Sequence, residues 1–381
     1  MLKYYNKLIK NNYLIYILSI FVLILTYKYN LFKFTEAANG PLMPWDGGRY
    51  LRPSNFKEML NEQYFVSFPF YYFFVGIFKK YNLINLLPIT QFLIFHFSCF
   101  LLYKTISKTY NSNIAFFTWL IILLNPIFFK WCHAVNPLII TISLCILSLS
   151  ILLSEKSKII ITFLVLFLLL KNDAKLILNY LVLNYFFLRK IFKTTNTKIF
   201  ISLFLITIFI SIHHILILNS STSSGFITAA SSIEGHDILK QGAELKLYEK
   251  QILENCSITE MNSLKNHFCI ITNYPQYSLE LYSKRLIYGL FWISPSFSLQ
   301  YQIISILMLF FYYFFLLFGL NNRNNILLLI NFISPFILTL PYILDGDQRF
   351  ITHSYVFLTP LTAAGLYFFV SKFFNFLNYS R

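Results

Sequence analysis

The sequence predicts an all-α protein, a polytopic bundle of about ten membrane-spanning helices with further helices on the outer face of the membrane. Two observations predict this class. Hydrophobic residues make up 57% of the 381 residues and charged residues only 12%, whereas soluble domains carry about 25% charged residues. Long runs of Leu, Ile and Phe also recur along the chain, and about 20 apolar residues in a row are what a spanning helix needs. The composition therefore excludes an ordinary soluble enzyme.

Ten apolar segments are the expected spans. Several are shorter than about 20 residues, so we expect flanking polar residues to share the membrane depth. An eleventh apolar segment, 64–78, is short and contains Pro69 and Gly76; it either spans the membrane or lies in its interface. The expected spans are 13–32, 84–103, 112–129, 137–154, 158–170, 174–188, 198–218, 298–320, 324–343 and 351–371.

The distribution of charge decides the orientation. With 64–78 in the interface and the N-terminus in the cytoplasm, the inner loops hold 14 basic groups against one acid, which is +13. The outer segments hold 17 basic groups and 14 acids, which is +3. If 64–78 spanned instead, the basic loop 189–198 would face outward, against the positive-inside rule. We therefore predict a cell (inner) membrane protein with both termini in the cytoplasm and no role in binding nucleic acid.

This topology divides the chain into three parts. Residues 1–218 form an N-terminal transmembrane module with a first outer loop at 33–80, residues 219–297 form a long outer loop, and residues 298–381 form the C-terminal helices. The first span lacks a signal-peptide cleavage pattern and is expected to remain as an anchor. In the long loop, residues 278–292 have apolar residues at helical spacing, which predicts an interfacial helix. Its adjacent Lys284 and Arg285 either hold a lipid phosphate or only anchor the helix.

Two cysteines of the long outer loop, Cys256 and Cys269, fall on the side where disulfides persist. The sequence leaves two options open, a disulfide between them or two separate thiols. A zinc site is not indicated, because His267 beside Cys269 does not make a metal-ligand pattern.

The first outer loop carries the strongest candidate for chemistry. Asp46 follows Trp45 and precedes two glycines, which let the backbone turn sharply and approach a ligand closely. A carboxylate at the membrane surface can act as a base or bind a hard cation, and Arg49 presents a planar fork that suits phosphate. The alternative is a solvated Asp-Gly turn followed by an arginine that reaches to the interface.

Polar groups also stand at the outer ends of later spans. Ionisable residues at membrane depth are candidates for function. Each also has a structural explanation, such as an ion pair of Asp173 with Lys171 or Lys175, or an ordinary polar turn before the last span. The candidates are His133, Asn136, Asp173 and Arg349.

Taken in order, these motifs resemble the GT-C superfamily of polytopic glycosyltransferases. They are most similar to bacterial sugar transferases akin to protein O-mannosyltransferases and the lipid A aminoarabinose transferase. The sequence departs from the family pattern at two points, because Asp46 stands alone where many relatives have an acidic pair and Phe350 replaces a frequent Tyr. The likeness rests on the motifs Trp45–Tyr50, Phe68–Tyr72, Leu124–Pro137 and Gln348–Phe350, on the long outer loop, and on Pro360 in the last span.

The resemblance implies a GT-C-like fold and an inverting transfer of a sugar from a polyprenyl-phosphate-linked donor to a glycan, lipid or protein acceptor on the outer face. Asp46 would accept or orient the acceptor hydroxyl proton, with or without a divalent cation that it would bind. Cationic side chains would hold the departing lipid phosphate, whose developing charge they stabilise. Asp46, Arg349 and the 284–285 pair should then converge on one outward-facing cavity. The substrate-binding residues are expected to be Arg49, Tyr50, His133, Asn136, Asp173, Lys284, Arg285 and Arg349.

Two other classes stay open. An O-antigen-type polysaccharide polymerase or ligase also has many spans and a large outer loop, but needs no carboxylate in the first loop. A lipid-carrier transporter or flippase is expected to show repeat symmetry and paired broken helices near the middle of the membrane, and the sequence shows neither.

Overall fold

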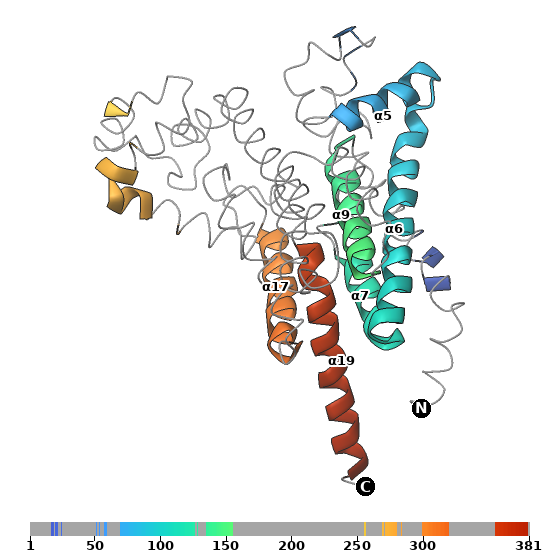
Figure 1. Cartoon of the computed structure of the whole chain (residues 1–381), viewed down its shortest axis with the longest axis vertical. Coiled ribbons are helices and arrows are strands. Elements are labelled where there is room, and N and C mark those ends of the chain that lie inside the picture. The colour runs from blue at the N-terminus through green and yellow to red at the C-terminus, as the bar shows by residue number, and fades with distance from the viewer. Residues whose placement is uncertain are drawn as a thin grey trace, which may run out of the picture. The chain divides into compact units, whose positions relative to one another are not determined.

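The structure, a computed structural model, describes part of the chain in detail, and all regular structure in that part is helical. The described residues are 17, 18, 20, 21, 24, 51, 53, 57, 58, 69–125, 128, 135–154, 255, 256, 269, 271–279, 283, 299–319 and 355–379. No strand occurs among them. The elements are α5 (Pro69–Lys80), η1 (Ile84–Leu86), α6 (Leu87–Thr109), α7 (Ser112–Leu124), α9 (Leu138–Leu153), α17 (Leu299–Gly319) and α19 (Tyr355–Tyr379) (Figure 1).

The chain divides into two compact units, which we describe separately. The first contains residues 1–178, 312–329 and 352–381, and so includes α5, η1, α6, α7, α9, α19 and the end of α17. The second contains residues 179–311 and 330–351.

In the first unit, α5 ends in a tight turn that leads into α6. Asn82 has φ 56°, a left-handed conformation that Asn tolerates better than most residues. The Leu83 N–H donates to the carbonyl of Phe78 at 2.8 Å, and the Asn82 N–H to that of Lys79 at 3.1 Å. This pair of bonds is a Schellman motif, which satisfies the last carbonyls of a helix. Figure 1 shows α5 lying across the end of α6 rather than alongside it.

Helices α6, α7 and α9 pack as neighbours, with α6 in contact with both others. The two-residue link between α6 and α7 makes them a helical hairpin. It is fixed by Asn111, whose Oδ1 accepts a hydrogen bond from the Ile114 N–H at 2.7 Å and so caps the start of α7. Between α6 and α9, the hydroxyls of Thr105 and Ser150 lie 2.7 Å apart. Buried aromatic side chains such as Trp119 fill the space between these helices.

Helix α19 packs on α7 and α9, and the end of α17 packs on α19. The ring of Phe369 lies 5.5 to 6.0 Å from those of Phe314, Phe315 and Phe318, distances typical of edge-to-face aromatic packing. Pro360 lies inside α19, where it lacks the N–H that would bond to the preceding turn.

Two described helical stretches are long and apolar enough to cross a membrane. They are Ile84–Thr109, with 26 residues, and Tyr355–Phe373, with 19 residues. At about 1.5 Å per residue they measure about 39 and 28 Å, against about 30 Å for a bilayer core. Shorter apolar helical segments are Ser112–Leu124, Leu138–Ile151 and Ile306–Gly319.

Candidate functional site

Most residues that the sequence singles out for chemistry lie outside the described residues, and so does their predicted convergence on one cavity. Asn136 is the exception among the candidate substrate-binding residues. The undescribed candidates are Asp46, Arg49, Tyr50, His133, Asp173, Lys284, Arg285 and Arg349. The described residues instead reveal the framework to which the segments carrying these candidates are attached.

Asn136 begins α9. It is 7% exposed, and its Oδ1 accepts a hydrogen bond from the Leu138 N–H at 2.9 Å. Such a side-chain-to-backbone bond two residues on is an Asx turn, which favours the chain reversal before a helix. Pro137 follows Asn136 directly, and the Pro137 carbonyl accepts the first helical bond, from Thr141, at 2.9 Å. The bond therefore fixes the end of the connection that contains His133.

The other end of that connection is held by a buried polar cluster, which we call the Tyr312 cluster: Asn125, Tyr312 and Thr359. The Asn125 Nδ2 donates to the Tyr312 hydroxyl at 3.2 Å. The same hydroxyl lies 3.2 Å from the Thr359 Oγ1. All three side chains are fully buried, and each hydrogen bond matters more in a low-dielectric interior. The cluster thus joins the end of α7 to α17 and α19.

A pair of tyrosines, Tyr313 and Tyr355, adds a second contact between α17 and α19. The hydroxyls of Tyr313 and Tyr355 lie 3.1 Å apart, and the Thr362 hydroxyl donates to the Tyr312 carbonyl at 3.3 Å. Tyr355 follows Arg349 by six residues, so this contact fixes the start of the helix that the candidate arginine precedes.

Lys79, in the last turn of α5, contacts the chain just after the first-loop motif. Its ammonium donates to the carbonyls of Leu51 at 2.7 Å and Pro53 at 2.8 Å. Leu51 directly follows Tyr50, the last residue of the Trp45–Tyr50 motif. Helix α5 is itself tied to α6, because the buried Tyr71 hydroxyl donates to the Gln91 Oε1 at 2.8 Å.

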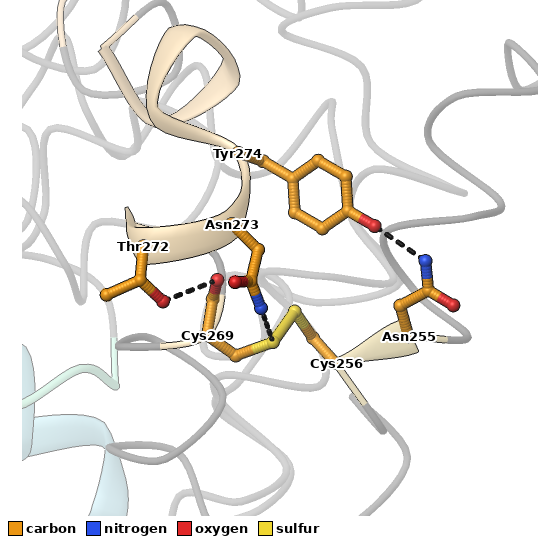
Figure 2. Close-up of a disulfide and its surroundings, with 6 residues drawn as sticks. All are labelled: Asn255, Cys256, Cys269, Thr272, Asn273 and Tyr274. Carbon is orange, nitrogen blue, oxygen red and sulfur yellow. Dashed lines mark hydrogen bonds between the residues drawn. A yellow bond between two sulfur atoms is a disulfide. The ribbon is translucent and has the colours of Figure 1, made fainter.

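In the second unit, Cys256 and Cys269 form a disulfide with 13 residues of separation (Figure 2). The sequence alone left a pair of separate thiols equally open. Figure 2 shows three hydrogen bonds around it: Asn273 Nδ2 to Cys269 Sγ at 3.3 Å, Thr272 Oγ1 to the Cys269 carbonyl at 3.3 Å, and Asn255 Nδ2 to the Tyr274 hydroxyl at 2.7 Å. Residues 275–279 are helical, and the last two of them are the first residues of segment 278–292, which the sequence predicts to be an interfacial helix.

Within the described part of the chain, no three His, Cys, Asp or Glu side chains gather in a way that would hold a metal ion. Asp46, the residue to which the sequence assigns a cation, lies outside that part.

Comparison of the chain with protein-family models, with curated proteins and with solved structures finds no match.

Sequence reasoning missed the Tyr312 cluster and the contact of Lys79. Tyr312 lies in the run Phe310–Phe315, where no local signal distinguishes it from its aromatic neighbours. Its partner Asn125 is 187 residues away in the chain. Lys79 and Lys80 form a pair at the end of an apolar helix, a pattern typical of lysines that reach to the membrane interface. The sequence does not tell the two lysines apart, whereas the structure does.

Proposed function

We propose that the chain is a polytopic membrane glycosyltransferase that moves a sugar from a polyprenyl-phosphate-linked donor to a cell-envelope acceptor on the outer face of the cell membrane. The proposal rests on the first-loop carboxylate and the outer basic residues that the sequence singles out. Two structural observations support it: the apolar surfaces of the helices and the disulfide.

The helix surfaces support a membrane location. Large apolar side chains are exposed on several of the described helices, among them Leu93 and Phe97 on α6, Leu317 on α17 and Phe368 on α19. Contiguous exposed apolar surface is uncommon on soluble monomers, whereas lipid tails accept it. The buried Ser and Thr hydroxyls of α6 and α19 donate to carbonyls four residues earlier, as Ser98 does to Ile94 at 2.8 Å and Thr359 to Tyr355 at 2.9 Å. Such local pairing is what a helix requires where no water is available.

The disulfide supports the placement of the active site on the outer face of the membrane. Disulfides persist in oxidising compartments and are rare in the cytosol, so the bond between Cys256 and Cys269 supports an external position for loop 219–297. In the ten-span topology the first loop, with Asp46, lies on the same side as that loop. Lipid-linked donors present their sugars at the membrane surface, so a carboxylate and basic residues on that face suit such a substrate.

The proposed reaction is a single displacement at the anomeric carbon. Asp46 takes the proton of an acceptor hydroxyl, the hydroxyl oxygen bonds to C1 of the sugar, and the bond from C1 to the phosphate oxygen breaks. The configuration at C1 inverts, and polyprenyl phosphate leaves with the bonding electrons. Arg349, Arg285 and Lys284 stabilise the phosphate charge, since cations fixed where charge develops lower the barrier.

The experiment is to compare the lipid-linked glycans of cells with and without the protein, and then to incubate the purified protein in nanodiscs with the donor that accumulates. We expect the donor to accumulate in cells that lack the protein, and the purified protein to transfer its sugar with inversion. Sugar that moves between leaflets without transfer would identify a flippase, and addition of whole glycan chains would identify a polymerase or ligase. Either result would overturn the proposal.

The topology has its own test, which does not depend on activity. Reporter fusions at position 109 should be active in the cytoplasm, and fusions within 236–266 should be active outside. The opposite pattern would place loop 219–297, with Lys284 and Arg285, in the cytoplasm and would contradict the proposed site on the outer face.

A further inference from the structure

Lys79 makes a contact that the neighbouring lysine does not make. Its ammonium donates to two backbone carbonyls, those of Leu51 and Pro53. A lysine ammonium has three donors and no acceptor, so it can bond to two carbonyls at once. Lys80 is exposed, and its ammonium lies 5.7 Å from the ring centre of Tyr81. Two adjacent lysines at one helix end therefore have different roles.

The element that carries Lys79 is fixed at both ends. Near its start, the buried Tyr71 donates to Gln91 of α6. Its end is closed by the Schellman motif at Asn82 and Leu83. A cation in the last turn is also favoured by the partial negative charge at the end of a helix. The ammonium is thus attached to a rigid base, and the chain it binds is held relative to α5 and α6.

We propose that Lys79 is a positioning residue for Asp46, an inference that rests on the proposed function. The bonded carbonyls come directly after the Trp45–Tyr50 motif, and Asp46 precedes Leu51 by five residues. An extended chain covers at most about 3.6 Å per residue, so Asp46 lies within about 18 Å of the Leu51 anchor. Pro53 restricts the bound chain further because its ring fixes φ.

The two bonds set the direction of the chain as well as its position. One carbonyl would fix a single point and let the loop swing about it, whereas carbonyls of residues 51 and 53 fix a short path. A carboxylate that acts as a base must stay within hydrogen-bond reach of the proton it removes. A displacement of about 1 Å can lower a rate by about 100-fold. Loss of the anchor should therefore reduce turnover without removing any group that touches the substrate.

The test uses the full-length protein in nanodiscs and the variants Lys79→Met, Lys79→Arg and Lys80→Met. Lys79→Met keeps the length of the side chain but removes its donors, and Lys80→Met is the matched control on the same helix turn. Hydrogen–deuterium exchange of peptides covering 45–58 reports the anchor, and steady-state sugar transfer reports its effect. Both are normalised to monodisperse protein.

We expect Lys79→Met to speed exchange in 45–58 and to lower kcat about 10- to 100-fold, with KM for the lipid donor changed less than about twofold. Lys79→Arg should recover part of the lost kcat, because a guanidinium also donates several N–H bonds. Lys80→Met should behave as the wild type in both measurements. Adding Lys79→Met to Asp46→Asn should cause little further loss, since residues that act as one unit are not additive.

Wild-type exchange and kcat in Lys79→Met would overturn the inference, and so would equal losses in Lys80→Met. A failure of Lys79→Arg to recover any kcat, or a further 10-fold loss when Lys79→Met is added to Asp46→Asn, would show that Lys79 acts on general stability instead. If the wild-type protein transfers no sugar, the proposed function fails. The exchange measurement still tests the anchor in that case.

Discussion

Gly319 of α17 and Gly365 of α19 bring two helix backbones into direct contact. A Cβ atom added to Gly365 would collide with the Phe315 carbonyl and lie 2.9 Å from the backbone nitrogen of Gly319. One added to Gly319 would collide with the Leu361 carbonyl and lie 3.3 Å from the nitrogen of Gly365. Small residues permit this close approach between helices in a membrane, where van der Waals packing drives association. Neither position has space for a side chain.

Replacement of Gly365 by alanine should therefore weaken the contact between α17 and α19. Because the added methyl group meets backbone atoms rather than a flexible side chain, the helices must separate, and overpacking of this kind costs about 1 to 3 kcal/mol. We expect a lower thermal midpoint in detergent micelles for Gly365→Ala and a larger drop for Gly365→Leu. Leu317→Ala is the control, because Leu317 lies on the partner helix α17 but is 71% exposed. Equal midpoints for Gly365→Leu and the wild type would show that the two helices do not meet in this way.

The Tyr312 cluster predicts a coupling between residues that lie far apart in the sequence. Tyr312→Phe removes the hydroxyl that lies between Asn125 and Thr359, and the loss of buried hydrogen bonds typically costs about 1 kcal/mol each. Thr359→Val should cost less in a Tyr312→Phe background than in the wild type. A double-mutant cycle of unfolding in mixed micelles measures this difference.

The control for that cycle is Tyr367→Phe on α19, whose ring contacts Phe368 outside the cluster. It should be additive with Thr359→Val within about 0.5 kcal/mol. If Tyr312→Phe is equally additive, the cluster does not couple α17 to α19.

The disulfide predicts a compartment and a stability effect. Thiol labelling of intact cells with a membrane-impermeant maleimide should modify Cys256 and Cys269 only after mild reduction, whereas the buried Cys99 stays unlabelled in both conditions. The Cys256→Ser/Cys269→Ser variant should lower the free energy of unfolding of this segment by about 3 kcal/mol, the value expected for a closed loop of about 15 residues. Limited proteolysis of the long loop checks the second expectation. Labelling without reduction, or labelling only after cells are broken, would contradict the outer position.

Among the described helices, four follow expected spans closely, and the differences at their ends have physical causes. The expected span 112–129 is α7, which stops at Leu124 because Asn125 precedes Pro126 and takes an extended conformation that residues before proline favour. The expected span 84–103 continues to Thr109 in α6. Hydropathy places the end of the span at Lys104 because that residue is charged. The helix continues past it, and the Lys104 ammonium lies over the ring of Phe100, one turn earlier, at 4.5 Å.

The contacts between helices could not be predicted from local sequence patterns. No periodicity distinguishes Gly365 from other small residues of its helix, or Tyr312 from the aromatic residues beside it, because both are defined by a partner elsewhere in the chain. The two options for Cys256 and Cys269 were open for the same reason. The candidate catalytic residues, with Asp46 first, stay predictions of the sequence.

The central claim is that Asp46 acts as the base in sugar transfer, and Asp46→Asn tests it most directly. The change keeps the shape of the side chain and removes its ability to accept a proton. Glu36→Gln makes the same chemical change in the same predicted loop and is the matched control. Measured as transfer from the lipid-linked donor by equal amounts of monodisperse protein in nanodiscs, kcat should fall at least about 100-fold in Asp46→Asn and stay near the wild-type value in Glu36→Gln. A kcat for Asp46→Asn within a few fold of the wild type would contradict the account.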